Sequence, residues 1–490
     1  MKKIKLVWKR FLLWIGATAL LLSSAACKQE ISADDQEPND VERLYISLAE
    51  NTEEASATPA PAPDNRYVWD TSAYGSNMTI HVDAPVTVPD QPLYVTRFIS
   101  DGFHQEQITD LFNHLFAGKE ATTTVGFNDP TKAELRELVA ELKRQLAEGT
   151  YDTQEFSAEE FQSFIDMMEE SVKDAPEKPA ETIRANGTMQ TMYNEAMDSD
   201  YQMLSAICEG DCSLNVTSYP AAVNSAVWSE CRFAVIDAPY YNMLEAVEIT
   251  DGNALPKHTD RVSYSYMDAK ALADGVVAST GVPAEMQTAY LMNDVQNGTV
   301  DGIVRDAETW AYKFVYQRTV DGIPVAVDAW DSSAFVDEKM EVIIDSNGIA
   351  DFLWKSPLTL TADPVGGGQL LPFDEARVIF ESSAVFTYAD RAKLQGEKVD
   401  HVEYGVNVNN VQLCYICITK QESGEGLIVP AWIFYGDITH KIHWKDGSVL
   451  DLGLEQGGSG RTGSQVLRGH TIVFAINAVD GSVIDVAQGY

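Results

Sequence analysis

The cysteines are the residues of this chain whose spacing most directly suggests chemistry. Cys208 and Cys212 bracket three residues, and Cys231 follows close behind them. In an oxidising compartment such a trio predicts a disulfide, although spacing alone does not say which two thiols pair. Cys414 and Cys417 have CxxC spacing but lie in the apolar run VQLCYICIT, which predicts a buried strand. Thiols three apart on a strand point to opposite faces, so we expect two small buried hydrophobes there.

The histidines and acids lack the spacing that familiar metal and catalytic sites require. A tetrahedral zinc site needs four ligands, and no second CxxC or HxxxH supplies them. His440 and His443 form a weak i, i+3 pair, which we interpret as part of a solvated loop. No GxSxG elbow occurs, and the GxGxxG at 458–463 does not connect a strand to a helix. A loose acidic cluster does not fit a calcium loop; its members are Asp328, Asp331, Asp337 and Glu338. The sequence therefore predicts no catalytic residue, no metal site and no cofactor.

Cys27 closes an N-terminal segment with the layout of a secretion signal. The first ten residues carry five positive charges, residues 11–22 carry none, and the small residues 23–26 precede the cysteine. Basic, apolar and small segments in this order are typical of a signal peptide. The cysteine directly after the small residues resembles a lipobox, with Ser24 where that motif prefers Leu. We therefore predict a lipoprotein signal peptide over 1–26, with Cys27 as the lipid anchor in a bilayer.

The segment after Cys27 has the composition of a tether. Residues 28–66 are acidic and rich in Ala, Pro, Ser and Thr, so they bury too little apolar surface to fold. We expect a disordered tether over 27–74. Removing the five positive charges of residues 1–26 takes the net charge from −39 to −44. This acidity excludes nucleic acid as a partner, because phosphate neutralisation needs a basic surface.

Apolar periodicity predicts the first elements of the folded body. Alternation between Met78 and Val88 predicts two short strands broken at 83–85. Asp129 and Gly149 are expected to cap one helix, and the Ser157-x-x-Glu160 pattern to open the next. The pattern from 180 to 260 is weak and indicates only a mixed region.

The second half shows one order of elements twice: helix, strand, strand, then strand, glycine turn and strand. The first copy comprises a helix from Asp268 to Gly281, a strand at 312–318, a turn at 320–324 and a hairpin around 345–349. The second comprises a helix opening at Phe373, strands at 406–419 and 427–435, and a turn at 477–481. A helix laid across a small antiparallel sheet buries one face of each element.

These copies resemble the PepSY-like and cystatin-like modules of extracytoplasmic Gram-positive proteins. The resemblance rests on a Tyr-x-Phe strand, on Asp/Asn-x-x-Gly-x-Ile turns, and on the closing strands at 429–432 and 477–481. It covers roughly residues 260–490, and the whole arrangement is similar to an uncharacterised family of Gram-positive, gut-type lipoproteins. The resemblance implies binding or restraint of peptidases, or regulation of membrane sensor kinases. It transfers no catalytic residue.

We therefore expect an α+β protein with a tandem C-terminal half. An N-terminal α+β domain would span 75–260, followed by modules at 261–360 and 369–490. Each module would be a helix packed on a small antiparallel sheet.

The expected function is that of a non-enzymatic binding or regulatory lipoprotein on the extracytoplasmic face of the cell membrane. Its partner would be a protein or peptide, bound through a sheet edge or face. Two alternatives stay open, namely carbohydrate or solute capture and a hydrolase with a site of scattered acids. The aromatic rows at 310–316 and 432–444 could stack on sugars, although core packing is their expected role.

Overall fold

The computed structural model describes most of the body of the chain. The described residues are 45, 66–75, 77–126, 129–151, 157–194, 198–208, 211–219, 229–236, 241–249, 255–256, 258–294, 299–300, 303–304, 309–327, 337–366, 369–393, 398–419, 425–454 and 470–486. Cys27, the predicted signal peptide, residues 458–463 and most of the predicted tether lie outside them. Within these ranges no helix combines the length and the apolar character that crossing a bilayer requires.

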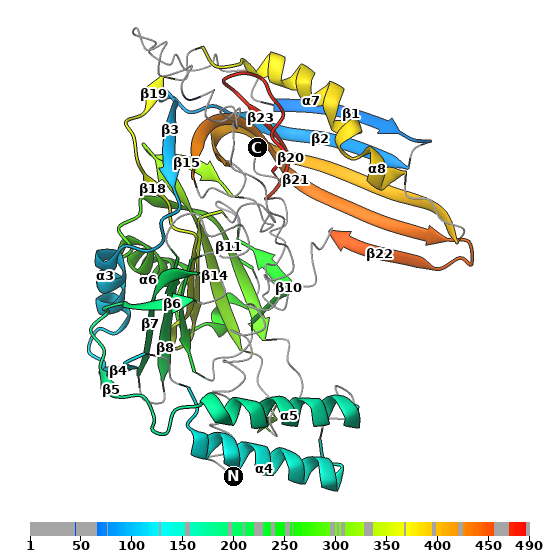
Figure 1. Ribbon diagram of the computed structural model, residues 1–490. Helices are drawn as coiled ribbons and strands as arrows, with labels where there is room; N and C mark the ends of the chain where they lie inside the picture. Colours follow the sequence, from blue (N-terminus) through cyan, green and yellow to red (C-terminus); the bar gives the residue numbers. More distant parts are fainter. Residues whose placement is uncertain are drawn as a thin grey trace, which may run out of the picture.

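Strand outweighs helix, 48% against 24%. Twenty-one of the described strands belong to one hydrogen-bonded network, which has two parts. We call the part built on the long β20–β21 hairpin the hairpin sheet, and the part in which β-hairpins follow one another the meander sheet (Figure 1). A separate pair, β12 (Thr299–Val300) and β13 (Ile303–Val304), stands outside the network.

The hairpin sheet is organised around β20 (Val399–Thr419) and β21 (Glu425–Trp444), which pair antiparallel along nearly their whole length. On one side, β2 (Met78–Thr87) runs parallel to β20, and β1 (Arg66–Ala73) pairs with β2. On the other side, β21 pairs in turn with β3 (Tyr94–Ile99), β23 (Thr471–Asn477) and β22 (Val449–Leu454). The short strands β18 (Thr359–Leu360) and β19 (Val365–Gly366) pair with β3.

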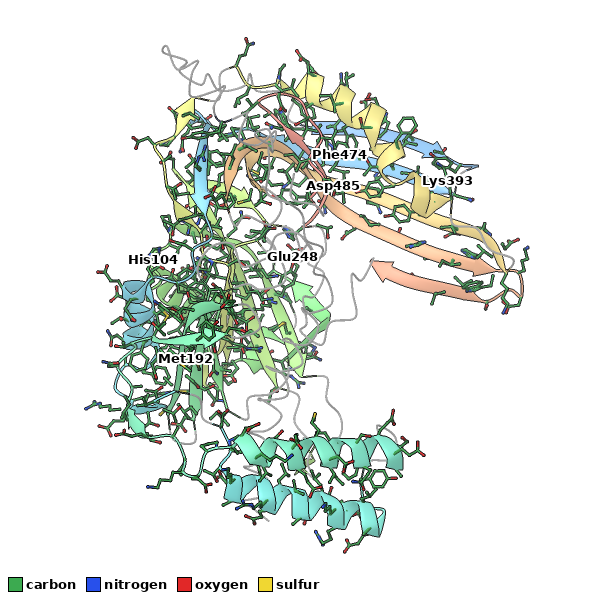
Figure 2. The ribbon with its side chains drawn as sticks, viewed as in Figure 1. His104, Met192, Glu248, Lys393, Phe474 and Asp485 are labelled. Atoms are coloured by element: carbon green, nitrogen blue, oxygen red, sulfur yellow. The ribbon has the colours of Figure 1, made fainter. Side chains whose placement is uncertain are left out.

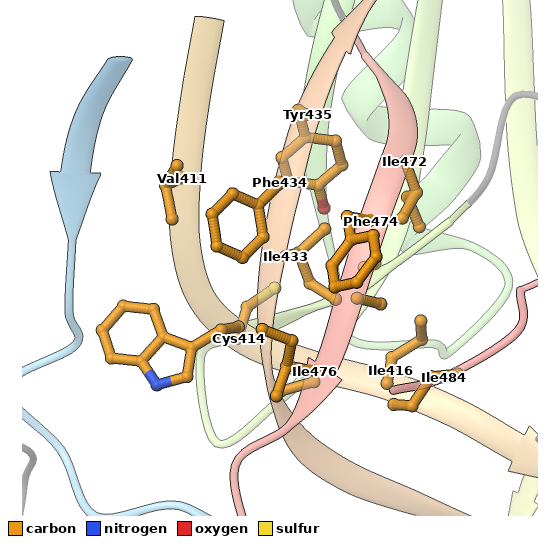
Figure 3. Close-up of a cluster of buried hydrophobic side chains, with 14 of the residues drawn as sticks. Val411, Cys414, Ile416, Ile433, Phe434, Tyr435, Ile472, Phe474, Ile476 and Ile484 are labelled. Carbon is orange, nitrogen blue, oxygen red and sulfur yellow. The ribbon is translucent and has the colours of Figure 1, made fainter. Parts of the chain in front are cut away.

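Helices α7 (Phe373–Thr387) and α8 (Ala389–Ala392) cover one face of the hairpin sheet (Figure 1). Phe380 of α7 stacks on Phe434 with ring centroids 4.3 Å apart, and Phe474 meets it edge-on. Figure 3 shows Phe434 and Phe474 among the aliphatic side chains of β20, β21 and β23. The indole N–H of Trp432 donates to the Leu371 carbonyl at 2.8 Å, so this large ring is buried without an unsatisfied donor.

The meander sheet is antiparallel, in the order β6–β7–β8–β9–β17–β16–β14–β11–β10; β4 also pairs with β7, and β5 pairs with β4. Helices α3 (Gln105–Leu115) and α6 (Tyr266–Ala278) lie on one face (Figure 1), and a 3-10 turn at Thr259–Arg261 precedes α6. The strands are β4 (Ala121–Thr124), β5 (Thr182–Arg184), β6 (Gln190–Asn194), β7 (Ser199–Cys208), β8 (Cys212–Ser218), β9 (Glu230–Val235), β10 (Tyr241–Glu248), β11 (Ala284–Asp294), β14 (Trp310–Val320), β16 (Lys339–Asp345) and β17 (Gly348–Lys355).

One short strand joins the two sheets. After β14, Asp321 and Gly322 adopt positive φ values of 51° and 77°, which reverse the chain tightly. The strand that follows, β15 (Ile323–Ala326), pairs with β14 and also runs parallel to the end of β20. The predicted turn at 320–324 is therefore confirmed, and it places β15 at the junction.

A helical hairpin stands apart from both sheets, at the bottom of Figure 1. It consists of α4 (Lys132–Glu148) and α5 (Ala158–Asp174), which have an apolar cluster of their own. The Ser157–Glu160 capping box and the left-handed Gly149 cap are confirmed. The N-cap of α4 is Thr131 rather than Asp129, because its hydroxyl reaches the Glu134 N–H.

The predicted fold class is wrong. The chain is mostly β, and its helices do not each cover a small sheet of their own in tandem modules. Strands β2 and β3, assigned to an N-terminal domain, pair with β20 and β21, and β9 pairs with β17 across the expected boundary at 260. Periodicity predicted many of these strands, but it carries no information about partners distant in the sequence.

Two local predictions also need correction. Residues 66–73, placed in the tether, form β1, and Tyr67 packs edge-on against Phe373 of α7. The expected break at 83–85 does not occur, because β2 continues through Pro85 with strict alternation of buried and exposed residues. The ladder to β20 is interrupted there instead, between Val82 and Val86. This fits a residue that has no N–H to donate.

A buried ion pair beside the junction gives a test of the fold. Glu338 accepts from the Arg318 guanidinium and from the indole N–H of Trp354, while Arg318 also donates to the Leu358 carbonyl at 2.8 Å. Replacing Glu338 with Gln would leave a buried guanidinium uncompensated. We expect a loss of about 3–5 kcal/mol in the free energy of unfolding, measured by urea denaturation.

The exposed pair between Arg66 and Asp83 is the matched control. Asp83→Asn should change the free energy of unfolding by no more than about 1 kcal/mol. Equal effects of the two substitutions would contradict the role assigned to the buried pair.

Candidate functional site

The predicted site residues have different outcomes. Cys27 lies outside the described residues, so its lipidation stays a prediction. Cys208, Cys212 and Cys231 are free thiols in the core beneath α3, and their disulfide also stays a prediction. Cys414 and Cys417 are buried in β20, as expected. Burial raises the pKa of Cys414 to about 12 and that of Cys417 well above its usual value, so neither is a reactive thiolate.

The structure brings together one set of metal-ligand side chains that the sequence did not indicate. His401 and His443 stand directly opposite each other on β20 and β21, and Glu403 lies two residues along β20 on the same face. The Nε2 atom of His443 is 3.2 Å from Glu403 Oε1, and that of His401 is 3.9 Å from it. All three candidate ligand atoms lie within 4.8 Å of one another. We call these three residues the His/Glu cluster.

Neighbouring groups orient the cluster. Asp400 Oδ2 lies in hydrogen-bond contact with His401 Nδ1 at 3.0 Å, which leaves Nε2 directed at Glu403. The two imidazole rings stack with centroids 4.0 Å apart and planes within 10°. His443 Nε2 is shielded from solvent, and it makes no hydrogen bond of standard geometry among the described residues. A carboxylate that fixes the other ring nitrogen is a usual companion of a metal-binding histidine.

His440 and His443 do not lie in a solvated loop, so that interpretation is wrong. These residues lie within β21 rather than in a solvated loop, and three residues apart on a strand they face opposite sides. His440 is buried on the helix-covered side, edge-on to Tyr404. The partner of His443 is His401, and the one sequence signal for it was the alternation His401-x-Glu403 in a strand. That signal says nothing about which distant histidine it will face.

A second group of charges lies on the meander sheet, on the face away from α3 and α6. Arg232 pairs with Asp351 at 2.9 Å, and Lys313 pairs with Glu341 at 2.9 Å. Burial raises the pKa of Asp351 above its usual value despite Arg232. Burial also acts to raise the pKa of Glu341, but nearby lysines outweigh it and hold that pKa below its usual range. Each carboxylate faces a cation of the sheet, which fits a structural network better than a hydrolytic pair.

A polar contact joins the two sheets near β10, where Figure 2 labels Glu248. His470, just before β23, lies with Nε2 2.7 Å from Glu248 Oε1, and the Thr288 hydroxyl donates to the same oxygen at 3.1 Å. Burial would raise the pKa of Glu248, but the hydrogen bond and charge of His470 lower it overall. The contact therefore favours a charged glutamate and a fixed junction.

The aromatic rows belong to the core, as expected. Tyr312, Phe314 and Tyr316 face α6, and Trp432 and Phe434 face α7. These five rings therefore offer no exposed platform on which a sugar could stack.

No protein-family model matches the chain, and no curated protein matches it. A solved structure with some likeness is that of an uncharacterised protein from Eubacterium rectale ATCC 33656. It is 10% identical, and the alignment covers 91% of this chain and 99% of that one with a TM-score of 0.40. A likeness at this level carries no argument about function.

Proposed function

We propose that this chain is a non-enzymatic, lipid-anchored binding protein of the extracytoplasmic membrane face that captures a divalent metal ion of the zinc class at the His/Glu cluster. The observation that carries the proposal is the convergence of two imidazoles and one carboxylate on the same face of β20 and β21. This is the solute-capture alternative of the sequence analysis, made specific by a site.

The spacing of the cluster suits zinc. Zinc binds imidazole nitrogen and carboxylate oxygen at about 2.0–2.2 Å, so neighbouring ligand atoms of a tetrahedral site lie roughly 3.3 Å apart. The separations of 3.2 and 3.9 Å between the histidine nitrogens and Glu403 Oε1 are close to this value. Imidazole ligands also favour zinc over calcium and magnesium, which prefer an all-oxygen environment.

The surroundings favour binding over catalysis. Three protein ligands leave one coordination position open, as in catalytic zinc sites. However, the side chains of His401 and Glu403 are 43% and 56% exposed, so water reaches two of the three ligands, although His443 Nε2 is shielded. Enzyme sites gain much of their electrostatic strength by excluding water. A partly exposed centre with an open position is better suited to hold an ion or to share it with a ligand of a partner.

Zinc titration tests the site. By isothermal titration calorimetry we expect one zinc ion per chain. The variants His401→Ala, Glu403→Gln and His443→Ala should each bind at least ~100-fold more weakly, because a lost ligand costs more than a lost orienting partner. Asp400→Asn should cost roughly 10–100-fold, as expected for the group that orients His401.

His81→Ala is the control for this titration. His81 is an exposed histidine with Nδ1 2.6 Å from Asp70 Oδ1, so it resembles His401 but stands outside the cluster. Its removal should leave zinc affinity unchanged. Absence of zinc binding by the parent protein, or parental affinity in both cluster histidine variants, would rule the site out.

The anchor has its own test, independent of the metal. Cys27 is the residue that the lipobox-like segment offers for acylation. Cys27→Ala should release folded protein from the membrane fraction into the medium. Immunoblots of fractionated cells and of the medium would measure this release. In cells fed an alkyne fatty acid, the wild-type protein should become labelled and the Cys27→Ala variant should not. Retention of the variant in the membrane fraction would contradict lipid anchoring.

Recognition of a protein or peptide is the second candidate function, and the outer edge of β1 favours it. β1 pairs with β2 along eight residues, and no other described strand pairs with it. An exposed edge is a template for an added strand. The net charge of −39 selects a basic occupant, so the partner would be an extended peptide rich in lysine or arginine.

Two proline variants distinguish loss of binding at the outer edge of β1 from loss of folding. Consecutive residues of an antiparallel strand direct their N–H groups to opposite edges, so Thr71→Pro and Ser72→Pro remove one outward and one inward donor. The variant with the smaller fall in melting temperature should lose binding of a synthetic alternating Lys–Val peptide. A Glu–Val peptide, the control, should bind neither the parent nor the variants. Undiminished Lys–Val binding by the more stable variant would remove β1 as the docking edge.

A further inference from the structure

The register of the meander sheet decides which of three buried cysteines can pair. Cys231 on β9 stands opposite Val216 on β8, and Val216 is four residues from Cys212. At about 3.3 Å per residue, the Cα atoms of Cys212 and Cys231 are roughly 14 Å apart. A disulfide needs Cα atoms within about 7 Å. Cys208 lies one strand farther from β9, so Cys231 cannot reach either thiol.

Cys208 and Cys212 meet the geometric requirement. They are directly opposite each other as the closing pair of the β7–β8 hairpin. Facing residues of an antiparallel pair have Cα atoms about 4.5–5.5 Å apart, within the range that disulfides span. The Asp211 N–H donates to the Cys208 carbonyl at 3.2 Å and fixes the turn between them. Both side chains lie on the core face beneath α3.

One cation sits beside this pair. The ammonium of Lys119, in the segment between α3 and β4, lies 3.8 Å from Cys212 Sγ. Burial raises the pKa of the Cys212 thiol, and Lys119 opposes that shift by stabilising the thiolate. The thiolate is the species that attacks a disulfide, so Lys119 makes ionisation of Cys212 easier than burial alone would allow.

We infer that Cys208 and Cys212 form a cross-strand disulfide and that Cys231 stays a thiol. Formation would proceed by exchange with an extracytoplasmic disulfide oxidant. The thiolate of one cysteine attacks one sulfur of the oxidant and releases a thiol, and the other cysteine then displaces the second thiol. Two protein thiols are oxidised, one oxidant disulfide is reduced to two thiols, and the protons of the protein thiols pass to the departing sulfurs. In the cell this inference rests on the proposed extracytoplasmic location.

The closed loop is short, so the bond stabilises the folded chain little. Its removal should therefore leave the protein folded. The oxidised pair is better understood as a site of redox modification than as a cross-link that stabilises the fold.

Peptide mapping with glutamyl endopeptidase tests the pairing. Glu195, Glu209, Glu230 and Glu245 place each of the three cysteines in a separate fragment. Purified protein is refolded in a glutathione redox buffer, remaining thiols are alkylated, and the digest is analysed without reduction. We expect fragments 196–209 and 210–230 joined with the loss of two hydrogen atoms, and fragment 231–245 alkylated. The refolding arm is independent of cellular location, so its failure is distinct from failure of the membrane anchor.

Matched variants complete the test. Cys208→Ala and Cys212→Ala should each abolish the linked product with circular dichroism unchanged, and Cys231→Ala should retain it. Lys119→Gln should slow its formation without changing which fragments are joined. Alkylation of all three cysteines in the refolded parent, or a link to fragment 231–245, would overturn the assignment.

Discussion

The pairing of β20 with β21 is the constraint on which the rest of the hairpin sheet depends. These strands pair from Val399 opposite Trp444 to Thr419 opposite Gly426, with register shifts after Val399 and after Val408, and every other strand of that sheet attaches directly or indirectly to one of them. The backbones approach closely at Gly436, next to the register shift after Val408. A Cβ at this position would lie 1.9 Å from the Asn407 carbonyl oxygen. A larger residue would force the strands apart and disturb the register on both sides.

The His/Glu cluster is a consequence of that register. Side chains alternate across a sheet, so moving β21 by one residue would carry His443 to the helix-covered face and bring Ile442 or Trp444 opposite His401. The packing of α7 prevents such a slip, because Phe434 and Trp432 must remain beneath it. An apolar core on one face therefore helps to fix the position of polar side chains on the other.

The same physics explains which sequence predictions succeeded. The capping box at Ser157, the turn at Asp321–Gly322 and the strand around Phe314 depend on neighbours in the chain, and all three were correct. The pairing of β2 with β20 joins segments separated by most of the chain, so no local pattern could predict it. His443 was noticed beside His440 but interpreted as part of a solvated loop, because its spacing in the sequence does not reveal the strand that places it opposite His401. Glu403 and His401 become candidate ligands only because β21 pairs with β20 and brings His443 beside them.

The charge of the chain bears on why the proposed metal capture would need histidines. A net charge of −39 raises the local concentration of all cations near the surface, and scattered carboxylates attract calcium and magnesium without preference for zinc. The buried acids of the meander sheet do not add to this field freely, because Arg232 and Lys313 face Asp351 and Glu341. Selectivity must then come from ligand type rather than from charge. Two imidazoles beside one carboxylate supply it, because their nitrogen donors suit zinc and do not suit the hard cations that the acidic surface gathers.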